Sequence, residues 1–330
     1  MRYPRSSPHF LACRLAVRPF LTPATVTLGL SGGADSLALL TAAVAEGQDL
    51  RAVVVDHRLQ PGSRQVAEKA CEQAESLGVG ATLRTVAVAE KGSLEANARQ
   101  ARYEALFAEG REVWVAHTRD DQAETLLLGA LRGNPAGMNP RAGDLVRPLL
   151  TVRRADTLGA CAELGLMPWH DPHNADPAFR RVALRRRVIP GLGELIGGDA
   201  VEPLATAADR IAADNALLEQ LAGPPTDDCA ELASQPGPLR RRRIAAWLHG
   251  RGLGVTGASI SAIEAPTTHS VCPFTPIGPS SKRASENGGV RVPSAPKKSS
   301  PRPTSARCTA TATISSTRTD ACAIGWNASR

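Results

Sequence analysis

The most constraining feature of this sequence is the regular alternation of short apolar strands with helices between residues 26 and 133. Runs rich in Val, Leu and Ala predict strands, at 26–30, 52–56, 82–88 and 113–116. Helices are predicted after them, at 36–45, 63–77, 93–109 and 120–131. Strands separated by helices of this length pair in parallel, and the helices cover both faces of the sheet. The sequence therefore predicts a doubly wound α/β fold.

The rest of the chain has a different pattern. An apolar stretch at 10–21, interrupted by arginines and a proline, predicts a helix within an N-terminal extension of residues 1–25. We expect the α/β domain to span residues 26–195. Apolar residues near a 3.6-residue period predict a small helical domain at 196–264. Residues 265–330 are rich in Ser, Thr, Pro and Arg without a sustained apolar period, which is typical of a disordered tail.

The excess positive charge of the chain lies in that tail. The formal net charge is +7, and residues 265–330 hold nine basic and two acidic residues, so residues 1–264 are neutral. The basic composition is therefore no evidence that the folded part binds nucleic acid. The body is rich in Arg and Ala, as expected of a GC-rich gene, and such a gene translated out of frame tends to give Arg, Pro, Ser, Ala and Thr. Of the two explanations, a disordered tail and a frameshift, we favour the frameshift.

The cysteine pattern excludes several classes of protein. The seven cysteines are widely spaced, their number is odd, and no Cys-x-x-Cys pair occurs. This argues against a disulfide scaffold, a zinc ribbon and an iron–sulfur site. No apolar run is long enough to span a bilayer. These features predict a protein of the reducing cytoplasm without a membrane partner.

A Gly-rich loop joins the first predicted strand to the first helix. Its glycines allow the backbone to approach a ligand closely, and the helix N-terminus behind them favours phosphate. Two serines add hydroxyl donors, and the aspartate is suited to hold Mg²⁺ or to cap the helix. The loop lacks the Gly-x-x-x-x-Gly-Lys pattern of a Walker A motif. Its residues are Ser31, Gly32, Gly33, Ala34, Asp35 and Ser36.

Polar residues follow three of the predicted strands directly. They are Ser31, Asp56 and His117. The carboxyl ends of parallel strands meet at one edge of a sheet, and ligands bind at that edge. We therefore expect these three residues to belong to one site.

The helix after His117 adds two carboxylates. Asp121 and Glu124 are three residues apart and share a helix face, where they can hold an ammonium group. The alternative for Asp121 is a capping box with Thr118. On the preceding helix, Arg99 and Arg102 lie one turn apart; they can clamp phosphate or a carboxylate, or face solvent.

The string Ser-Gly-Gly-x-Asp-Ser at 31–36 resembles the signature of the PP-loop ATP pyrophosphatase superfamily, which has a Rossmann-like parallel sheet. These enzymes cut ATP between its α- and β-phosphates and adenylate an oxygen of their substrate. The resemblance implies that residues 31–36 and Asp56 bind ATP, with Mg²⁺ held by Asp35.

The order of further motifs is similar to that of the bacterial tRNA(Ile)-lysidine synthase family over roughly residues 26–190. The motifs are Val55–Leu59, Leu94–Tyr103, Ala116–Thr125, Arg147–Leu150 and Asp171–Asp176. The similarity implies a ligase that uses ATP to join free L-lysine to C2 of the wobble cytidine in tRNA(Ile) with a CAU anticodon. The implied catalytic residues are Asp35, His117, Asp121 and Glu124, and the implied lysine- or substrate-binding residues are Arg99, Arg102, Asp121 and Glu124.

Several assignments stay open at this point. Arg181 and Arg185 are candidates for contacts with tRNA phosphates, and a solvated helix explains them equally well. Asp171 and Asn174 are also compatible with an Asx turn. The alternatives in function are a PP-loop tRNA thiolase, which the missing Cys-x-x-Cys disfavours, a nucleotide-binding protein without catalysis, and a damaged product that keeps only ATP binding. The oligomeric state is also open, with a homodimer as one possibility.

Overall fold

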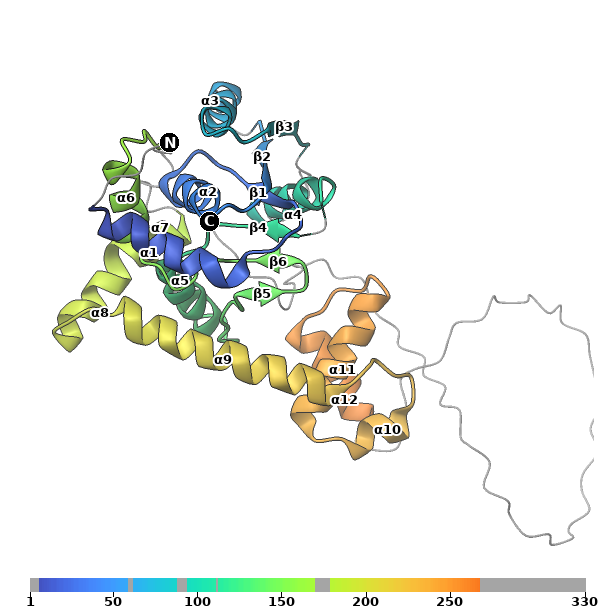
Figure 1. Cartoon of the computed structure of the whole chain (residues 1–330). Helices are drawn as coiled ribbons and strands as arrows, with labels where there is room; N and C mark the ends of the chain where they lie inside the picture. The colour runs from blue at the N-terminus through green and yellow to red at the C-terminus, as the bar shows by residue number, and fades with distance from the viewer. Residues whose placement is uncertain (1–5, 59–61, 88–93, 111, 170–178, 268–330) are drawn as a thin grey trace, which may run out of the picture. The chain divides into compact units, whose positions relative to one another are not determined.

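The computed structural model describes residues 6–58, 62–87, 94–110, 112–169 and 179–267. Its centre is a six-stranded sheet in the order β3-β2-β1-β4-β6-β5 (Figure 1). All neighbouring strands are parallel except β5, which is antiparallel to β6. The strands are β1 (Val26–Gly29), β2 (Leu50–Asp56), β3 (Ala81–Thr85), β4 (Val113–Trp114), β5 (Arg141–Ala142) and β6 (Leu145–Val146). The predicted α/β fold with a largely parallel sheet is confirmed.

The helices predicted between the strands are present. They are α2 (Ala34–Ala45), α3 (Ser63–Ser76), α4 (Leu94–Phe107) and α5 (Arg119–Ala130). The helix expected in the N-terminal extension is α1 (Pro8–Val17), followed by the short η1 (Arg18–Phe20). After the sheet come α6 (Arg154–Glu163), α7 (Arg180–Ala183), the π-helix η3 (Leu184–Val188), α8 (Ile189–Ile196) and α9 (Val201–Ala222).

The sheet is covered on both faces because its strands are apolar on both sides. In β2, Ala52 and Val54 pack into a core with α1, α2, α3 and α6. Val53, which points the other way, packs with Leu106 of α4. Figure 1 shows α1, α2 and α6 together on one side of the sheet and α4 on the other. Such near-continuous apolar strands are expected of a parallel sheet buried on both faces.

The order of the strands defines where a ligand can bind. From β1 the chain proceeds through β2 to β3 in one direction, and β4 lies on the opposite side of β1. In register, Thr27 pairs with Val113 and Leu28 with Trp114, so the loops after β1 and β4 leave the sheet side by side. This reversal is the topological switch point at which open α/β sheets bind ligands.

The described residues divide into two compact units, the first ending at Ala216 and the second beginning at Leu217. Within the second unit, α10 (Cys229–Ser234), α11 (Gly237–Gly250) and α12 (Gly257–Thr267) enclose a core of their own. The residues of this core are Cys229, Leu232, Ile244, Leu248, Val255 and Ile260. The helical character predicted for this part of the chain is therefore present, and the domain boundaries predicted at residues 25, 195 and 264 stay predictions.

Some predictions fall on other parts of the chain. The strands β5 and β6 and the helix α6 are not among the predicted elements; the pattern from residue 147 to 190 is less regular than before it. Other predictions concern positions outside the described residues. These positions are Asp171, Asn174, residues 59–60 and the tail from residue 268. No described helix is long and apolar enough to cross a membrane.

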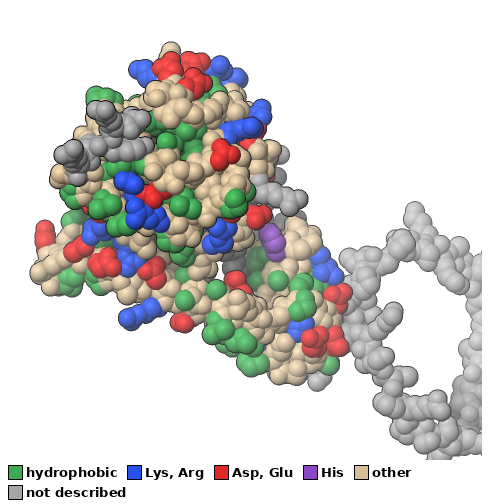
Figure 2. Space-filling model, in the orientation of Figure 1, with side chains coloured by type: hydrophobic (Ala, Val, Ile, Leu, Met, Phe, Trp, Pro, Cys, Tyr) green, Lys and Arg blue, Asp and Glu red, His purple; other side chains and the backbone are tan. Residues whose placement is uncertain are grey.

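The surface agrees with the neutral composition of residues 1–264. On the face drawn in Figure 2, the acidic and basic side chains of the first unit lie interspersed. Some of them pair directly, for example Arg64 with Glu68 at 2.8 Å and Arg141 with Glu112 at 2.9 Å. Exposed pairs of this kind contribute little to stability, so the site must be sought among buried charges.

One packing point joins the loop after α5 to α9. A Cβ atom added at Gly137 would lie 1.9 Å from the carbonyl oxygen of Ala208. The loop is held in place because Met138 exchanges two hydrogen bonds of 2.8 Å with the buried side chain of Gln122. A side chain at position 137 therefore has no room.

We predict that Gly137→Ala lowers the free energy of unfolding by about 1–3 kcal/mol, as overpacking does in other cores. Chemical denaturation of the full chain measures this value. Gly191→Ala in α8 is the matched control, since nothing lies within 4 Å of the position that its Cβ atom would take and alanine favours a helix. Equal stability of Gly137→Ala and the parent protein would contradict the packing described here.

Candidate active site

The loop after β1 is closed by its own hydroxyl groups. The Oγ atoms of Ser31 and Ser36 lie 3.1 Å apart, and Ser36 Oγ donates to the carbonyl of Gly33 at 2.9 Å. Gly33 is the N-cap of α2, and its backbone N–H lies 3.4 Å from Ser31 Oγ. The start of α2 is thus presented on a short turn, where its unpaired N–H groups can meet an anion.

Gly32 has a conformation that requires glycine. Its φ is +77°, and a Cβ atom there would lie 3.2 Å from the Cβ of Ala70 in α3. Its carbonyl accepts a hydrogen bond of 2.9 Å from the backbone of Trp169, which ties the loop to the segment after α6. The loop is therefore fixed from both sides.

Asp56 lies at the end of β2, the neighbour of β1, and is buried. Its Oδ1 accepts hydrogen bonds from Ser63 Oγ at 2.8 Å and from the backbone of Arg58 at 2.9 Å. Arg58 has a φ of +52°, the one positive value of a non-glycine residue in the described chain. Asp56 Oδ2 is buried and has no hydrogen-bond partner among the described residues. One carboxylate oxygen thus holds the turn, and the other can accept a ligand donor.

The segment after β4 forms the capping box that the sequence left as an alternative for Asp121. Thr118 donates to Asp121 Oδ2 through its backbone N–H at 2.8 Å and through its hydroxyl at 2.9 Å. The backbone N–H of Asp121 lies 3.4 Å from Thr118 Oγ1, which completes the box. Because only Oδ2 is used, Oδ1 of Asp121 is available to a second partner.

That second partner is Arg154, a residue that the sequence analysis did not single out. Its guanidinium lies 2.5 Å from Asp121 Oδ1 and 3.2 Å from Glu124 Oε1. It also lies 3.5 Å from Asp35 Oδ2 in the loop after β1. The structure therefore brings together three predicted carboxylates from two neighbouring strand ends around one arginine.

The position of Arg154 follows from how α6 begins. The carboxylate of Asp120 accepts a hydrogen bond of 2.8 Å from the backbone N–H of Arg154. The backbone of Arg119 donates to the carbonyl of Val152 at 2.8 Å. The first turns of α5 and α6 are thus joined, and the adjacent Thr157 donates its hydroxyl to Asp35. Asp35 lies in the first turn of α2 but makes no cap hydrogen bond, so the helix-capping alternative for it is wrong.

Glu124 is fully buried and forms ion pairs with two further arginines. Arg185 Nε lies 2.8 Å from Glu124 Oε1, and Arg181 Nη1 lies 3.4 Å from Oε2. Arg185 belongs to the π-helix η3, an element that is common at functional sites. The tRNA contact expected of Arg181 and Arg185 stays a prediction, and the structure gives both of them a partner inside the protein.

Burial and pairing shift the acidity of the carboxylates in opposite directions. Burial raises the pKa of Asp121, but the charge of Arg154 and the N–H of Thr118 outweigh it, so the pKa lies well below its usual range. For Asp35, burial dominates and raises the pKa, against the lowering by Arg154. Asp121 is therefore held as a carboxylate. The ionised form of Asp35 is less favoured, and a cation bound beside it would stabilise that form.

The opposite wall of the site carries positive charge with few acceptors. Arg147 follows β6 and is almost completely buried, and its Nε has no hydrogen-bond partner among the described residues. The same holds for Arg99 Nη2, Tyr103 Oη and His117 Nδ1. Burial, together with nearby Arg102, lowers the pKa of Arg99 to about 10. Both predicted arginines, Arg99 and Arg102, lie within 5.5 Å of the Tyr103 ring centre, as cations over its face. Unpartnered buried donors of this kind favour an anionic or carbonyl-bearing ligand.

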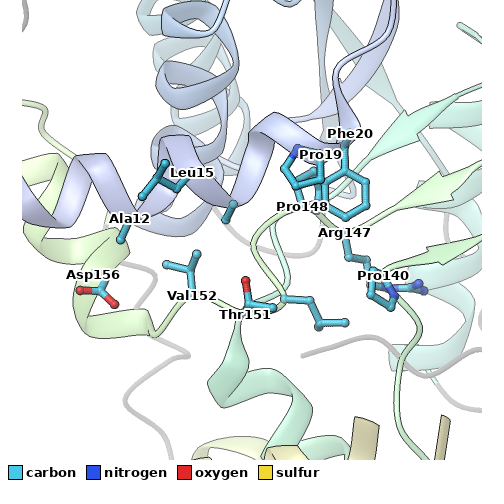
Figure 3. Close-up of a pocket in the computed structure, with 12 residues that line it drawn as sticks. Ala12, Leu15, Pro19, Phe20, Pro140, Arg147, Pro148, Thr151, Val152 and Asp156 are labelled. Carbon is cyan, nitrogen blue, oxygen red and sulfur yellow. The ribbon is translucent and has the colours of Figure 1, made fainter. Parts of the chain in front are cut away.

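A cavity of about 500 Å³ lies behind this wall, between α1, η1 and the segment 140–152. In Figure 3, Leu15 of α1 and Phe20 of η1 line it together with Pro148 and Val152. Its lining is mostly apolar; it includes Arg147, Pro148 and Leu150 of the motif at 147–150, but none of the residues predicted to be catalytic or to bind ATP, lysine or tRNA. The candidate site therefore lies at the strand ends and not in this cavity.

The donor set fits Mg²⁺ only together with a phosphate-bearing ligand. In the described part of the chain, no group of three or more His, Cys, Asp or Glu side chains is arranged to hold a metal. Asp35 offers a single carboxylate beside the loop. Mg²⁺ commonly binds through one or two carboxylates while substrate phosphates and water complete its octahedron, so Asp35 suffices.

The parallel sheet, the Ser-Gly-Gly-x-Asp-Ser loop and the switch-point site are those of a PP-loop protein, and residues 12–192 match the PP-loop domain family. A solved structure of the U34-tRNA thiolase NcsA from Methanococcus maripaludis has the same fold. It matches with a TM-score of 0.51 at 15% identity, over 62% of this chain and 79% of that one. Likeness at this identity extends to the fold alone.

Relatives of higher sequence identity show which PP-loop family the chain belongs to. The tRNA(Ile)-lysidine synthase of Corynebacterium glutamicum is 48% identical over 278 residues, covering 80% of this chain and 87% of its own. That of Corynebacterium diphtheriae is 53% identical over 267 residues, covering 81% and 90%. The chain belongs to the PP-loop family of tRNA(Ile)-lysidine synthases.

The environment of His117 leads to a prediction about pH. Burial lowers the pKa of His117 well below 6.5, and the charge of Arg147 lowers it further. Below about pH 6.5 the unfolded chain takes up a proton at this position that the folded chain does not. Stability should therefore fall on acidification by up to about 1.4 kcal/mol per pH unit from this residue alone.

We predict that His117→Gln removes this contribution, so the difference in unfolding free energy between variant and parent changes between pH 5 and 7. Urea titrations at several pH values measure it. His249→Gln, which removes an exposed imidazole, is the control. A constant difference for His117→Gln over this range would show that the buried imidazole titrates normally.

Proposed function

We propose that this chain is an ATP-dependent ligase that joins lysine to C2 of the wobble cytidine in an isoleucine tRNA. ATP adenylates the C2 oxygen and releases pyrophosphate. The ε-amine of lysine, after giving a proton to Asp121 or Glu124, attacks C2, and the C2–O bond breaks as AMP leaves with that oxygen. Family membership supports the reaction. The observation that carries it on this chain is the meeting of Asp35, Asp121 and Glu124 at one guanidinium, which places a nucleotide loop beside a pair of carboxylates.

The loop side is suited to hold the departing pyrophosphate. The N-terminus of α2, the backbone of Gly33 and the hydroxyls of Ser31 and Ser36 supply neutral donors to phosphate oxygens. Mg²⁺ at Asp35 would supply positive charge to the same oxygens. Asp56 Oδ2 is buried and has no partner among the described residues, so it can accept a hydrogen bond from a hydroxyl of the nucleotide.

The carboxylate side is suited to hold the amino acid. Asp121 keeps its negative charge because its pKa is lowered, so it can pair with the ammonium of lysine. Glu124 lies one helical turn away on the same face, fully buried. Two carboxylates at this spacing select a side chain that ends in a cation.

The cationic wall is suited to the RNA. His117 is neutral, because its pKa is lowered, and can exchange a hydrogen bond with a base without adding charge. Arg99 and Arg147 carry buried N–H groups that have no partner among the described residues, and these can meet a phosphate or a carbonyl oxygen. Lysine specificity and RNA binding thus come from opposite sides of one site. Localisation in the cytoplasm, where charged tRNA is used, is part of this proposal.

The test is to incubate the full chain with ATP, labelled lysine and total tRNA, and to follow label in tRNA together with AMP. Lysine-dependent label with AMP release supports the proposal. Sulfur-dependent modification without lysine would favour a thiolase instead. AMP release without transfer would favour a product that keeps the nucleotide site only.

In this assay we predict that Asp35→Ala abolishes AMP formation, a loss of at least about 100-fold, since it removes the carboxylate proposed to hold Mg²⁺ at the loop. Asp144→Asn, which changes an exposed carboxylate in the turn between β5 and β6, should retain parent activity. Circular dichroism of both variants checks folding. Undiminished AMP formation by a folded Asp35→Ala variant would refute the role of the loop.

We further predict that Asp121→Asn raises the KM for lysine by about 10- to 100-fold, because a charge-assisted hydrogen bond to the ammonium is lost. The KM for ATP should change far less, because Asp121 belongs to the carboxylate side. Steady-state kinetics with each substrate varied in turn give both constants, again with Asp144→Asn as control. An equal rise in both KM values would contradict a site with two separate halves, a nucleotide half-site at the loop 31–36 and an amine half-site at Asp121 and Glu124.

A further inference from the structure

Arg154 is the one described side chain that forms ion pairs with carboxylates of both half-sites. It lies 3.5 Å from Asp35 on the nucleotide side, and 2.5 Å from Asp121 and 3.2 Å from Glu124 on the amine side. Its side chain is 18% exposed, so it is enclosed but reachable by a ligand. The contact with Asp35 is the longest of the three.

Each carboxylate oxygen of the amine side already has a partner in this arrangement. Asp121 Oδ2 accepts two hydrogen bonds from Thr118, and Oδ1 faces Arg154. Glu124 Oε1 faces Arg154 and Arg185, and Oε2 faces Arg181. An arriving ammonium group therefore meets carboxylates whose oxygens are all engaged, and the guanidinium of Arg154 occupies the position between them.

The nucleotide side offers Arg154 a better partner. A phosphate bound at the start of α2 lies next to Asp35, within reach of a guanidinium that is 3.5 Å from that carboxylate. Arginine binds phosphate through two parallel hydrogen bonds, which makes phosphate a strong competitor for it. A shift of Arg154 toward the loop would release Oδ1 of Asp121 and would leave Glu124 Oε1 with Arg185 alone among the described residues.

We propose that Arg154 is a positioning residue that couples the two half-sites: it blocks the carboxylate pair while the loop is empty and exposes it when nucleotide phosphates bind. The proposal rests on the proposed function. By linkage, nucleotide raises the affinity for lysine, and lysine raises the affinity for nucleotide by the same factor. The amine is thereby admitted only when ATP is present to activate the acceptor.

The experiment measures lysine binding to the full chain by calorimetry, with and without a non-hydrolysable ATP analogue and Mg²⁺. For the parent protein we expect the Kd of lysine to fall about 10-fold when the analogue is present, a typical coupling between sites. The reciprocal titration, analogue binding with and without lysine, must give the same factor. Equal lysine affinities in the two conditions would overturn the proposal.

Two variants separate coupling from a merely structural role. In Arg154→Gln the blocking group is gone, so lysine should bind the nucleotide-free protein at least as tightly as the parent, and the coupling factor should fall to about 1. Arg154→Lys keeps a charge on a shorter stem without the planar fork, and should give an intermediate factor. If Arg154→Gln does not fold, Arg154→Lys decides: an unchanged coupling factor refutes the proposal.

Arg153→Gln is the matched control. Arg153 is the neighbour of Arg154 at the start of α6, but it pairs with Asp120 and Asp199 and with none of the three site carboxylates. It should keep the parent coupling factor. Weaker lysine binding by Arg154→Gln in both conditions would show that Arg154 only supports the fold of the site. Absence of lysine binding to the parent, with analogue and tRNA present, would overturn the proposed function itself and the coupling with it.

Discussion

The parallel pairing of β1 with β4 is the constraint on which the rest of the site depends. Because these strands are neighbours in the sheet but not in the sequence, the loop at 31–36 and the segment from His117 to Glu124 emerge side by side. A one-residue shift of this register would turn the alternating side chains of β4 to the other face. Val113 and Trp114 of β4 are both fully buried, one in each of the two cores that cover the sheet.

Arg154 compensates the negative charge of the carboxylates that β1 and β4 bring together. Three carboxylates in a space largely closed to water would repel one another and be protonated without a cation among them. Arg154, Arg181 and Arg185 supply the compensating charges, and the resulting network is neutral. Such a network contributes little net stability, yet removal of one member leaves the others uncompensated.

The sequence predicts most of what depends on local pattern. The strand runs, the helix periods and the Gly-rich loop specify the sheet and the position of Asp35, Asp56, His117 and Asp121 at its edge. It did not predict α6, because the pattern from residue 147 to 190 is less regular, nor that Arg154 would reach a loop more than a hundred residues earlier. That contact depends on how α5 and α6 are joined through Asp120, a tertiary feature without a sequence period.

The direction of the Arg181 and Arg185 side chains could not be predicted from the sequence either. A run of arginines predicts an exposed basic face equally well whether the helix lies on the surface or enters the site. Here Arg181 is buried against Glu124, and the π-helix at 184–188 directs Arg185 to the same carboxylate. Backbone irregularities of this kind leave no signal in residue type, so the inward direction of these side chains appears only in the folded chain.

The central claim is that a nucleotide loop and an amine site share one charge network centred on Arg154. The most direct test is a structure determined with L-lysine and a non-hydrolysable ATP analogue bound. We predict that the lysine Nζ lies within about 3 Å of both Asp121 and Glu124, with the Arg154 guanidinium turned to a phosphate oxygen. Lysine bound elsewhere, with Arg154 still on both carboxylates, would contradict it.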